Sequence, residues 1–418
     1  MTATGATGTG TVTRIFDAIL ASSESRRRWG LAVALIAGIG AGFACRPAEP
    51  RTFKQLRDHV TSLEPSERGA AIDRFLAARG GTPVIENQSK VIFLAQDRDG
   101  VAPRIVGDFN DWAIAVNGQD PSVGVTTRIE GTDWSYLEAS IYTNARAEYV
   151  LLFPTEAVAD PNNPRTVNAF AGPRSEVRMP QWVGQPEIDD AGEVATGTVT
   201  GEAIASKALG TSRRVWFYTP SEYATSQDWY PVLYVLDGGN YVERMRTPTI
   251  LDRLIARKAI PPLVAVFVEP GERQEEYSRN AKWRAFMATE LVPLVDKRFR
   301  TFPAPEKRVL LGSSLSAYGA VDLAVEYPAV FGLCAALAPP AQTPTVITNQ
   351  AKGREAIRAV RFFVLAGTYD SMANGGRRLR TALDIGTGAV TYMEVPEGHS
   401  TETFRGHLDD ALKALLTE

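Results

Sequence analysis

The sequence predicts an α/β fold, with a mostly parallel sheet covered by helices on both faces and a small β-sandwich before it. In the second half of the chain, short apolar runs alternate with stretches of helical periodicity. This alternation is typical of buried parallel strands and their connecting helices. Between residues 83 and 180, short β-type runs instead follow one another with turn residues between them, as in a sandwich.

The first 50 residues are predicted to be an export signal and tail. Arginines 26 to 28 precede an apolar run from Leu31 to Ala44, and Cys45 follows a small-residue exit. The run is shorter than the roughly 20 residues that a spanning helix needs. Cys45 resembles the lipidated residue of a bacterial lipoprotein, so we expect an exported periplasmic or cell-envelope protein, with membrane attachment through an N-terminal lipid as one form. A buried N-terminal helix or short anchor is the alternative.

The remaining chain divides into four segments. They are a helical lead-in over 51–82, the sandwich over 83–180, a linker over 181–195 and the α/β domain over 196–418. In the α/β domain we expect strands at 214–218, 231–236, 263–268, 309–311, 333–337, 362–365 and 390–395. The expected helices are 249–257, 283–299, 316–327, 376–385 and 403–416.

Composition excludes several classes of function. The net charge is −3 and no long basic run occurs, so nothing favours nucleic acid as a partner. The two cysteines, Cys45 and Cys334, are too few for a disulfide framework or a cysteine-based zinc site. The three histidines, His59, His399 and His407, nearly exclude a histidine-rich metal centre. We therefore expect no metal and no cofactor.

A candidate nucleophile lies in Gly312-Ser-Ser-Leu-Ser316, between an expected strand and an expected helix. A serine on such a tight turn presents its hydroxyl at the carboxyl edge of the sheet, as in α/β-hydrolases. The usual form is Gly-x-Ser-x-Gly, whereas Ser316 occupies the fifth position here. We identify Ser314 as the nucleophile. The alternative is an ordinary helix start capped by Ser313 or Ser314.

A serine nucleophile needs a base and an acid that orients it, and in this fold they follow the serine in the order acid, then histidine. His399 lies in a loop after an expected strand, whereas His407 lies in an expected helix, where it is expected on the surface. Asp370 follows the preceding strand and so reaches the same sheet edge. Glu394 and Glu397 are weaker rivals, because each is close to His399 in sequence.

An oxyanion hole requires two backbone N–H donors. One is expected from Leu315, directly after the nucleophile. The second is expected from Gly239, in the Asp237-Gly-Gly-Asn240 turn that follows an earlier strand, where glycines allow close approach of a substrate. The alternative for this segment is a simple β-turn.

Taken in order, these stretches resemble the esterase family that contains enterochelin esterases, feruloyl esterases and mycolyltransferase-like proteins. The matching stretches are 235–241, 290–300, the Ser314 turn, 366–370 and 398–405. The segment Val106–Trp112 resembles the early-set sandwich that precedes the catalytic domain in enterochelin-esterase-like proteins. The resemblance implies an α/β-hydrolase with the triad Ser314, Asp370 and His399. Ser316 and Ala317 depart from the usual glycines of the family.

The expected function is hydrolysis of carboxylic esters through an acyl-enzyme, on a small-molecule or carbohydrate-linked substrate. Resemblance to enterochelin esterases implies a siderophore ester. Feruloyl or acetyl groups on polysaccharide, and acyl transfer in place of hydrolysis, are alternatives. A non-catalytic ligand-binding lipoprotein is a further alternative, because the turn around Ser314 is altered. Trp112 would be a stacking platform for carbohydrate or, alternatively, a packed core residue.

Overall fold

The computed structural model describes residues 49–115, 118–169, 172–189, 192–348, 358–384 and 390–417. The expected export signal and Cys45 lie outside the described residues. Residues Arg51–Glu418 form one compact unit. Within the described ranges, no helix has both the length and the apolar character needed to cross a membrane.

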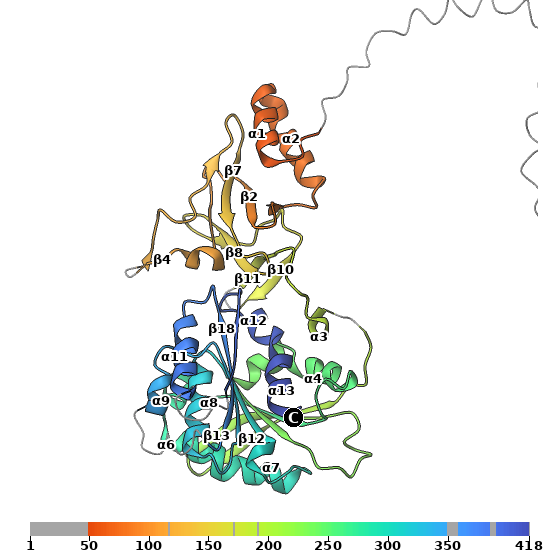
Figure 1. Ribbon diagram of the computed structural model, residues 1–418, viewed down its shortest axis with the longest axis vertical. Helices are drawn as coiled ribbons and strands as arrows, with labels where there is room; N and C mark the ends of the chain where they lie inside the picture. Colours follow the sequence, from red (N-terminus) through yellow and green to blue (C-terminus); the bar gives the residue numbers. More distant parts are fainter. Residues whose placement is uncertain are drawn as a thin grey trace, which may run out of the picture. The chain divides into compact units, whose positions relative to one another are not determined.

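Two helices, α1 (Phe53–Ser62) and α2 (Pro65–Ala77), open this unit (Figure 1). Thr52 and Gln55 form a capping box, in which each side chain accepts the other's backbone N–H. The apolar faces of both helices pack on the same core as Ile92, Leu94 and Trp134. The helices therefore cover one face of the sheet that follows.

Residues 84–178, which we call the two-sheet region, contain two antiparallel sheets. The first has the order β1-β2-β7-β6, and the second the order β10-β11-β8-β3 with β9 paired to β8. The strands are β1 (Val84–Glu86), β2 (Lys90–Gln96), β3 (Arg104–Gly107), β6 (Thr127–Arg128), β7 (Trp134–Ser140), β8 (Arg146–Leu152), β9 (Ala157–Val158), β10 (Thr166–Ala169) and β11 (Gly172–Arg178). Between β3 and β6 lie a 3-10 helix, η1 (Asp108–Ala113), and a small hairpin of β4 (Ile114–Ala115) and β5 (Gly118–Gln119).

The two faces of strand β2 pack in two different hydrophobic cores. Its side chains alternate between the two faces of the sheet. Ile92 and Leu94 pack against the helices, whereas Val91 and Phe93 pack in the core that includes Tyr149 of the second sheet. A strand buried on both faces reads as a continuous apolar run, which is what the sequence shows here.

The large sheet has eight strands in the order β12-β13-β15-β14-β16-β17-β18-β19. They are β12 (Thr198–Ser206), β13 (Thr211–Thr219), β14 (Val232–Leu236), β15 (Val264–Val268), β16 (Arg308–Ser313), β17 (Leu333–Leu337), β18 (Arg361–Gly367) and β19 (Val390–Val395). β12 pairs antiparallel with β13 and β13 antiparallel with β15, and the other neighbours are parallel. The seven expected strands coincide with β13 to β19.

Strand β12 was not predicted, because its sequence lacks an apolar run. Its first six residues are exposed, and only Ile204 and Ser206 are buried. The expected linker contains a short helix, α3 (Pro186–Asp189), whose carbonyl groups at Glu187 and Ile188 accept hydrogen bonds from Arg253. Both features depend on partners far away in the sequence.

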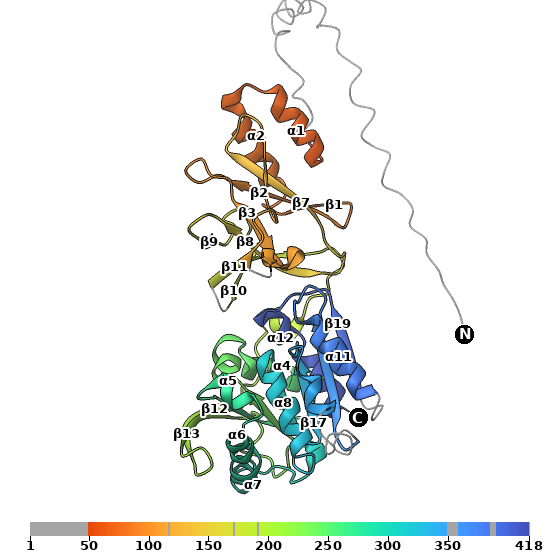
Figure 2. The ribbon, with the colours of Figure 1, turned by 90° about the vertical axis from the view of Figure 1, so that its left-hand side faces the viewer.

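Helices cover both faces of the large sheet (Figures 1 and 2). One face carries α4 (Thr247–Ala256) and α13 (Leu408–Leu416). The other carries α6 (Ala281–Ala285), a π-helix η3 (Phe286–Leu291), α7 (Val292–Arg298), α8 (Leu315–Glu326) and α11 (Ala373–Asp384). The remaining short helices are η2 (Asn240–Arg244), α5 (Arg273–Tyr277), η4 (Pro305–Lys307), α9 (Pro344–Thr348) and α12 (Thr401–Gly406).

The helix expected over 403–416 is two helices. The chain breaks at His407, which ends α12 and begins α13. Its side chain is buried, with Nδ1 at 2.8 Å from Asp410 Oδ2 and Nε2 at 3.6 Å from Glu397 Oε1. The prediction that His407 lies on a helix surface is therefore wrong, because the break turns the imidazole inward toward two carboxylates.

Candidate active site

The site is built on the turn between β16 and α8. Ser314 has φ 57° and ψ −127°, a conformation that side-chain-bearing residues rarely adopt. Its N–H donates to the Leu337 carbonyl of the neighbouring strand at 2.9 Å, and its own carbonyl accepts from Ala317. Such a backbone costs about 1–3 kcal/mol and persists only where its surroundings hold it. The side chain is thereby presented at the carboxyl edge of the sheet.

The two departures from the usual glycines fit this turn. The Ser316 hydroxyl accepts from the Ser313 N–H at 2.9 Å and donates to the Ser313 carbonyl at 2.8 Å. Ala317 is fully buried in the core below the sheet. The position in this turn that has no room for a side chain is Gly312, because a Cβ atom there would overlap the Ser316 carbonyl. Ser316 thus closes the turn with hydrogen bonds.

The structure brings Asp370 and His399 together. Asp370 Oδ2 lies 2.7 Å from His399 Nδ1, while its Oδ1 accepts from the Met372 N–H at 2.7 Å. The Asp370 side chain is buried and that of His399 is 31% exposed. The loops that carry them continue the pairing of β18 with β19, because the Thr368 N–H donates to Val395 and the Tyr369 N–H to Glu397. Phe404 packs edge-on against the imidazole.

The rival acids point elsewhere. Glu394 binds Arg377 and Tyr392, and the hydrogen bond from Arg377 is the main reason that its pKa falls to about 2. Burial would raise the pKa of Glu397, but the Arg146 charge and His407 lower it to about 2. Within the described ranges, no hydrogen bond or ion pair joins either carboxylate to His399, and His407 contacts Glu397 and Asp410. Asp370 is thus the carboxylate that the structure places on His399.

Ser314 and His399 line one cavity of about 440 Å³. Ser313, Phe404, Met245 and Asn240 contribute to its wall from the α/β part of the chain. Two further lining residues come from the two-sheet region: Ala169 and Arg174. The cavity therefore draws on both parts of the chain, which sequence reasoning did not anticipate.

The two expected oxyanion donors lie in different surroundings. Leu315 is the first residue of α8, where a helix has no internal partner for its N–H. The Gly239 N–H, by contrast, donates to Glu269 Oε2 at 2.6 Å. Burial raises the pKa of Glu269. A substrate oxygen could use Gly239 only in place of this carboxylate.

Sequence reasoning missed three charged residues of the cavity: Glu269, Arg273 and Arg174. Glu269 directly follows β15, so its position at the carboxyl edge was a usable signal. Arg273 makes two 2.7 Å hydrogen bonds to Asp237, whose backbone has a positive φ of 61°. Arg174 lies over the ring of Trp112 at 4.2 Å, so one face of that indole is already covered.

The chain matches a known family over much of the α/β part. Residues 206–405 match the model of the family described as "Putative esterase". This segment includes the Ser314 turn, Asp370 and His399.

Two curated relatives are similar at moderate identity. An uncharacterised protein, YjcH of Bacillus subtilis, is 29% identical over 32% of this chain and 59% of its own length. The iron(III) enterobactin esterase of Escherichia coli O6:H1 is 26% identical over 62% of this chain and 67% of its own. This chain thus spans about three-fifths to two-thirds of the length of these two relatives.

Among solved structures, the ferric enterobactin esterase of Salmonella typhimurium has a TM-score of 0.66 at 20% identity. The likeness covers 82% of this chain and 98% of that one. It therefore extends beyond residues 206–405 into the two-sheet region, and it supports the expected α/β-hydrolase type of fold. Residues 206–405 are therefore similar to this esterase family, and the fold of the chain is similar to that of an enterobactin esterase.

Proposed function

We propose that this protein is a serine hydrolase of carboxylic esters with the triad Ser314, His399 and Asp370. The observation that carries the proposal is the 2.7 Å contact between His399 Nδ1 and Asp370 Oδ2, beside a cavity that Ser314 also lines. A buried carboxylate on one imidazole nitrogen leaves the other free to act as a base. The strained backbone of Ser314 is typical of an activated nucleophile on such a turn.

The reaction follows from these positions. Ser314 Oγ attacks the ester carbonyl while His399 Nε2 takes its proton, and Asp370 stabilises the imidazolium. The N–H groups of Leu315 and Gly239 donate hydrogen bonds to the oxyanion. For this, the Gly239 N–H exchanges its bond to the Glu269 carboxylate for one to the substrate oxygen. His399 then protonates the leaving alcohol, and water repeats the sequence on the acyl-enzyme. No cofactor or metal takes part in these steps.

The proposed substrate is a siderophore ester of the enterochelin kind. The names of the E. coli and S. typhimurium relatives support this choice. Arg174 adds support, because it brings a cation to the cavity wall and catecholates that bind iron(III) are anionic. Feruloyl or acetyl esters of polysaccharide, acyl transfer in place of hydrolysis, and a non-catalytic binding role are the alternatives that the assays below separate.

Two further proposals rest on the sequence. We propose that residues 83–180 form an early-set-like sandwich domain, joined through 181–195 to the esterase domain at 196–418, and that residues 1–50 direct export. Lipidation of Cys45 would attach the protein to the cell envelope. Mass spectrometry of the mature N-terminus tests both the cleavage site and the lipid.

The catalytic proposal is tested by comparing the wild type with Ser314→Ala and His399→Gln on p-nitrophenyl acetate. Each variant is expected to lose at least about 10³-fold in kcat, because the nucleophile or its base is gone. His59→Gln, on helix α1, is the matched control and should keep wild-type turnover. Wild-type turnover by Ser314→Ala, or no labelling of Ser314 by a fluorophosphonate probe, would overturn the proposal.

The substrate is tested with ferric enterobactin, methyl ferulate and acetylated xylan under identical conditions, with products followed by chromatography. A siderophore esterase should release dihydroxybenzoyl-serine units with the highest kcat/KM. Preference for either of the other two esters would move the assignment to polysaccharide esters. Acylated sugar in place of free acid would indicate acyl transfer.

A further inference from the structure

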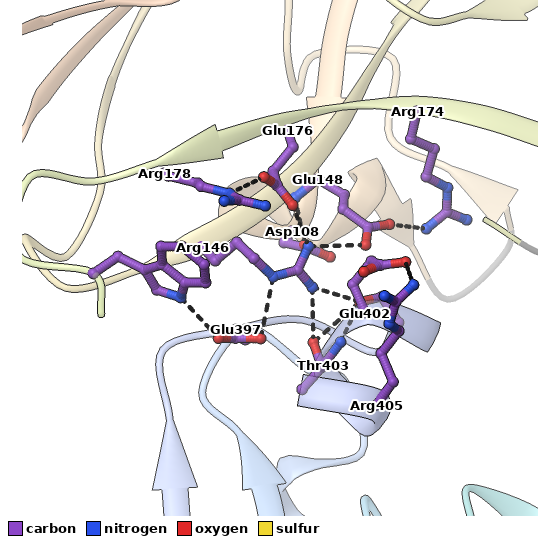
Figure 3. Close-up of polar contacts among 12 residues, drawn as sticks. Asp108, Arg146, Glu148, Arg174, Glu176, Arg178, Glu397, Glu402, Thr403 and Arg405 are labelled. Atoms are coloured by element: carbon purple, nitrogen blue, oxygen red, sulfur yellow. Dashed lines mark hydrogen bonds and ion pairs between the residues drawn. The ribbon is translucent and has the colours of Figure 1, made fainter. Parts of the chain in front are cut away.

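The loop that carries His399 is held largely by side chains of the two-sheet region. His399 lies between β19 and α12, and its neighbours Glu397 and Ser400 are buried, with 3% and 5% exposure. Ser400 also lines the Ser314 cavity. Both side chains, together with Thr403 of α12, contact the guanidinium of Arg146, which is the first residue of β8 (Figure 3).

Arg146 is only 2% exposed, and its guanidinium contacts two groups of partners. Toward the histidine loop, Nε donates to Glu397 Oε2 at 3.3 Å, and Nη2 donates to Ser400 Oγ at 2.8 Å and Thr403 Oγ1 at 3.2 Å. Toward its own sheet, Nη1 donates to Glu176 at 2.9 Å and Glu148 at 3.3 Å. Each of its nitrogens is thus committed, and a planar guanidinium has five N–H donors in a rigid fork.

Arg146 also separates like charges. Glu148, Glu176 and Glu397 are each at most 3% exposed and converge on this one cation (Figure 3). Other cations contact them singly: Arg174 at Glu148, Arg178 at Glu176 and His407 at Glu397. Without Arg146, Glu397 would face two buried carboxylates of the other sheet, and removal of one partner from such a group is strongly unfavourable. Glu397 is two residues from His399, so repulsion would act directly on its loop.

Two more contacts attach the catalytic loops to the two-sheet region, through Asp108 and Tyr142, and a third comes from Trp182 in the segment that follows it. The Asp108 carboxyl packs on Gly398 so closely that a Cβ atom there would overlap it. That carboxyl is held in turn by the Glu148 N–H at 2.7 Å and Trp112 Nε1 at 2.9 Å. Tyr369, beside Asp370, accepts the Tyr142 N–H at 3.0 Å, and Trp182 Nε1 donates to Glu397 at 3.2 Å.

We infer that Arg146 is a positioning residue for His399, so that the two-sheet region completes the geometry of the triad. The inference rests on the proposed function, since it takes His399 as the base of Ser314. Arg146 does not itself line the cavity; it acts by holding Ser400, which does, together with Glu397 and Thr403, and hence the imidazole between them. A displacement of about 1 Å at a catalytic group can cost on the order of 10²-fold in rate.

The test compares Arg146→Met with the wild type at a temperature where circular dichroism shows both to be folded. We expect kcat on p-nitrophenyl acetate to fall about 10- to 100-fold with KM changed by less than about 3-fold, because acylation depends on the base. The rate of fluorophosphonate labelling at Ser314 should fall in parallel. The downfield proton resonance of the His399 Nδ1–H should broaden or disappear.

Arg308→Met is the matched control. Arg308 is 5% exposed, pairs with Asp296 at 2.6 Å and begins strand β16, at the sheet edge opposite Ser314. The Arg308→Met variant should be less stable than the wild type but keep its kcat and the downfield resonance of His399. Equal kcat in Arg146→Met and Arg308→Met would show that Arg146 serves stability alone and would overturn the inference.

Two further variants keep the test decisive. If Arg146→Met does not fold, Thr403→Val removes one acceptor of the guanidinium without exposing a charge, and kcat should fall about 2- to 5-fold at unchanged KM. An unchanged kcat there would contradict the inference. Ser314→Ala in the same assay distinguishes failure of the proposed function from failure of the role of Arg146. Wild-type turnover by Ser314→Ala would reject the proposed function. An inactive Ser314→Ala together with a fully active Arg146→Met would reject only the role of Arg146.

Discussion

At the scale of the residue, the Ser314 turn depends on a neighbour that replaces a glycine. Ser316 is fully buried, and its hydroxyl both accepts from and donates to the backbone of Ser313. A glycine at position 316 would also fit in this turn, but it has no hydroxyl to form either hydrogen bond. The hydroxyl thereby stabilises the turn that holds Ser314 at positive φ.

The Ser316→Ala variant is expected to be less stable than the wild type by about 1–3 kcal/mol, because the buried Ser313 N–H loses its partner. Urea unfolding monitored by tryptophan fluorescence measures this difference. We also expect a lower kcat, since the strained backbone of Ser314 is held less firmly. The exposed Ser221→Ala is the control, with a change within about 0.5 kcal/mol. Equal stability of the two variants would argue against the role assigned to the Ser316 hydroxyl.

At the scale of the element, the break between α12 and α13 places His407 among carboxylates. Burial alone would lower the pKa of His407, but its contacts with Asp410 and Glu397 raise it to about 9. A pKa that is higher in the folded state means that the folded protein binds the proton more tightly. The stability from this group is therefore fully present below pH 6.5 and is lost as the pH rises through about 9.

For the wild type we expect the free energy of unfolding to decrease between pH 6.5 and 9. His407→Gln should flatten the curve in this window, with a difference of roughly 1–3 kcal/mol at its acidic end. Urea unfolding at several pH values checks this. The same series on His59→Gln should keep the wild-type slope. A slope that survives in His407→Gln would mean that another group titrates.

At the scale of the whole molecule, the two-sheet region and the α/β part share a buried set of charges. Arg146 lies at its centre, and its contacts with Glu397 join residues 251 positions apart. Buried ion pairs are only weakly screened by salt, in contrast to exposed ones. The two parts should therefore unfold together even at high ionic strength.

Differential scanning calorimetry of the whole chain is expected to show one transition for residues 51–418 in the wild type. In Arg146→Met the transition should split or broaden. Three buried carboxylates would then face one another without the cation between them, which destabilises the contact between the two parts by on the order of 3–5 kcal/mol. Arg308→Met should lower the transition temperature without splitting it. Two well-separated transitions in the wild type would contradict this picture.

Much of the α/β part followed from sequence alone, for local reasons. Strands β14 to β18 are short, mostly apolar runs, and a strand buried on both faces has few other compositions available. The nearness of Asp370 and His399 was expected because parallel neighbours end at the same edge of a sheet. By itself the sequence also determined the short list of candidate bases, since the chain has only three histidines.

Only the tertiary structure decided the rest, because it depends on partners that leave no local signature. β12 is polar and becomes a strand by pairing with β13 at the sheet edge. Glu397 looked like a rival orienting acid, yet its charge is directed to Arg146 of a different sheet. The occupation of the Gly239 N–H by Glu269 and the burial of His407 are of the same kind. Each of these features forms only when the folded chain brings groups that are far apart in the sequence within hydrogen-bond distance.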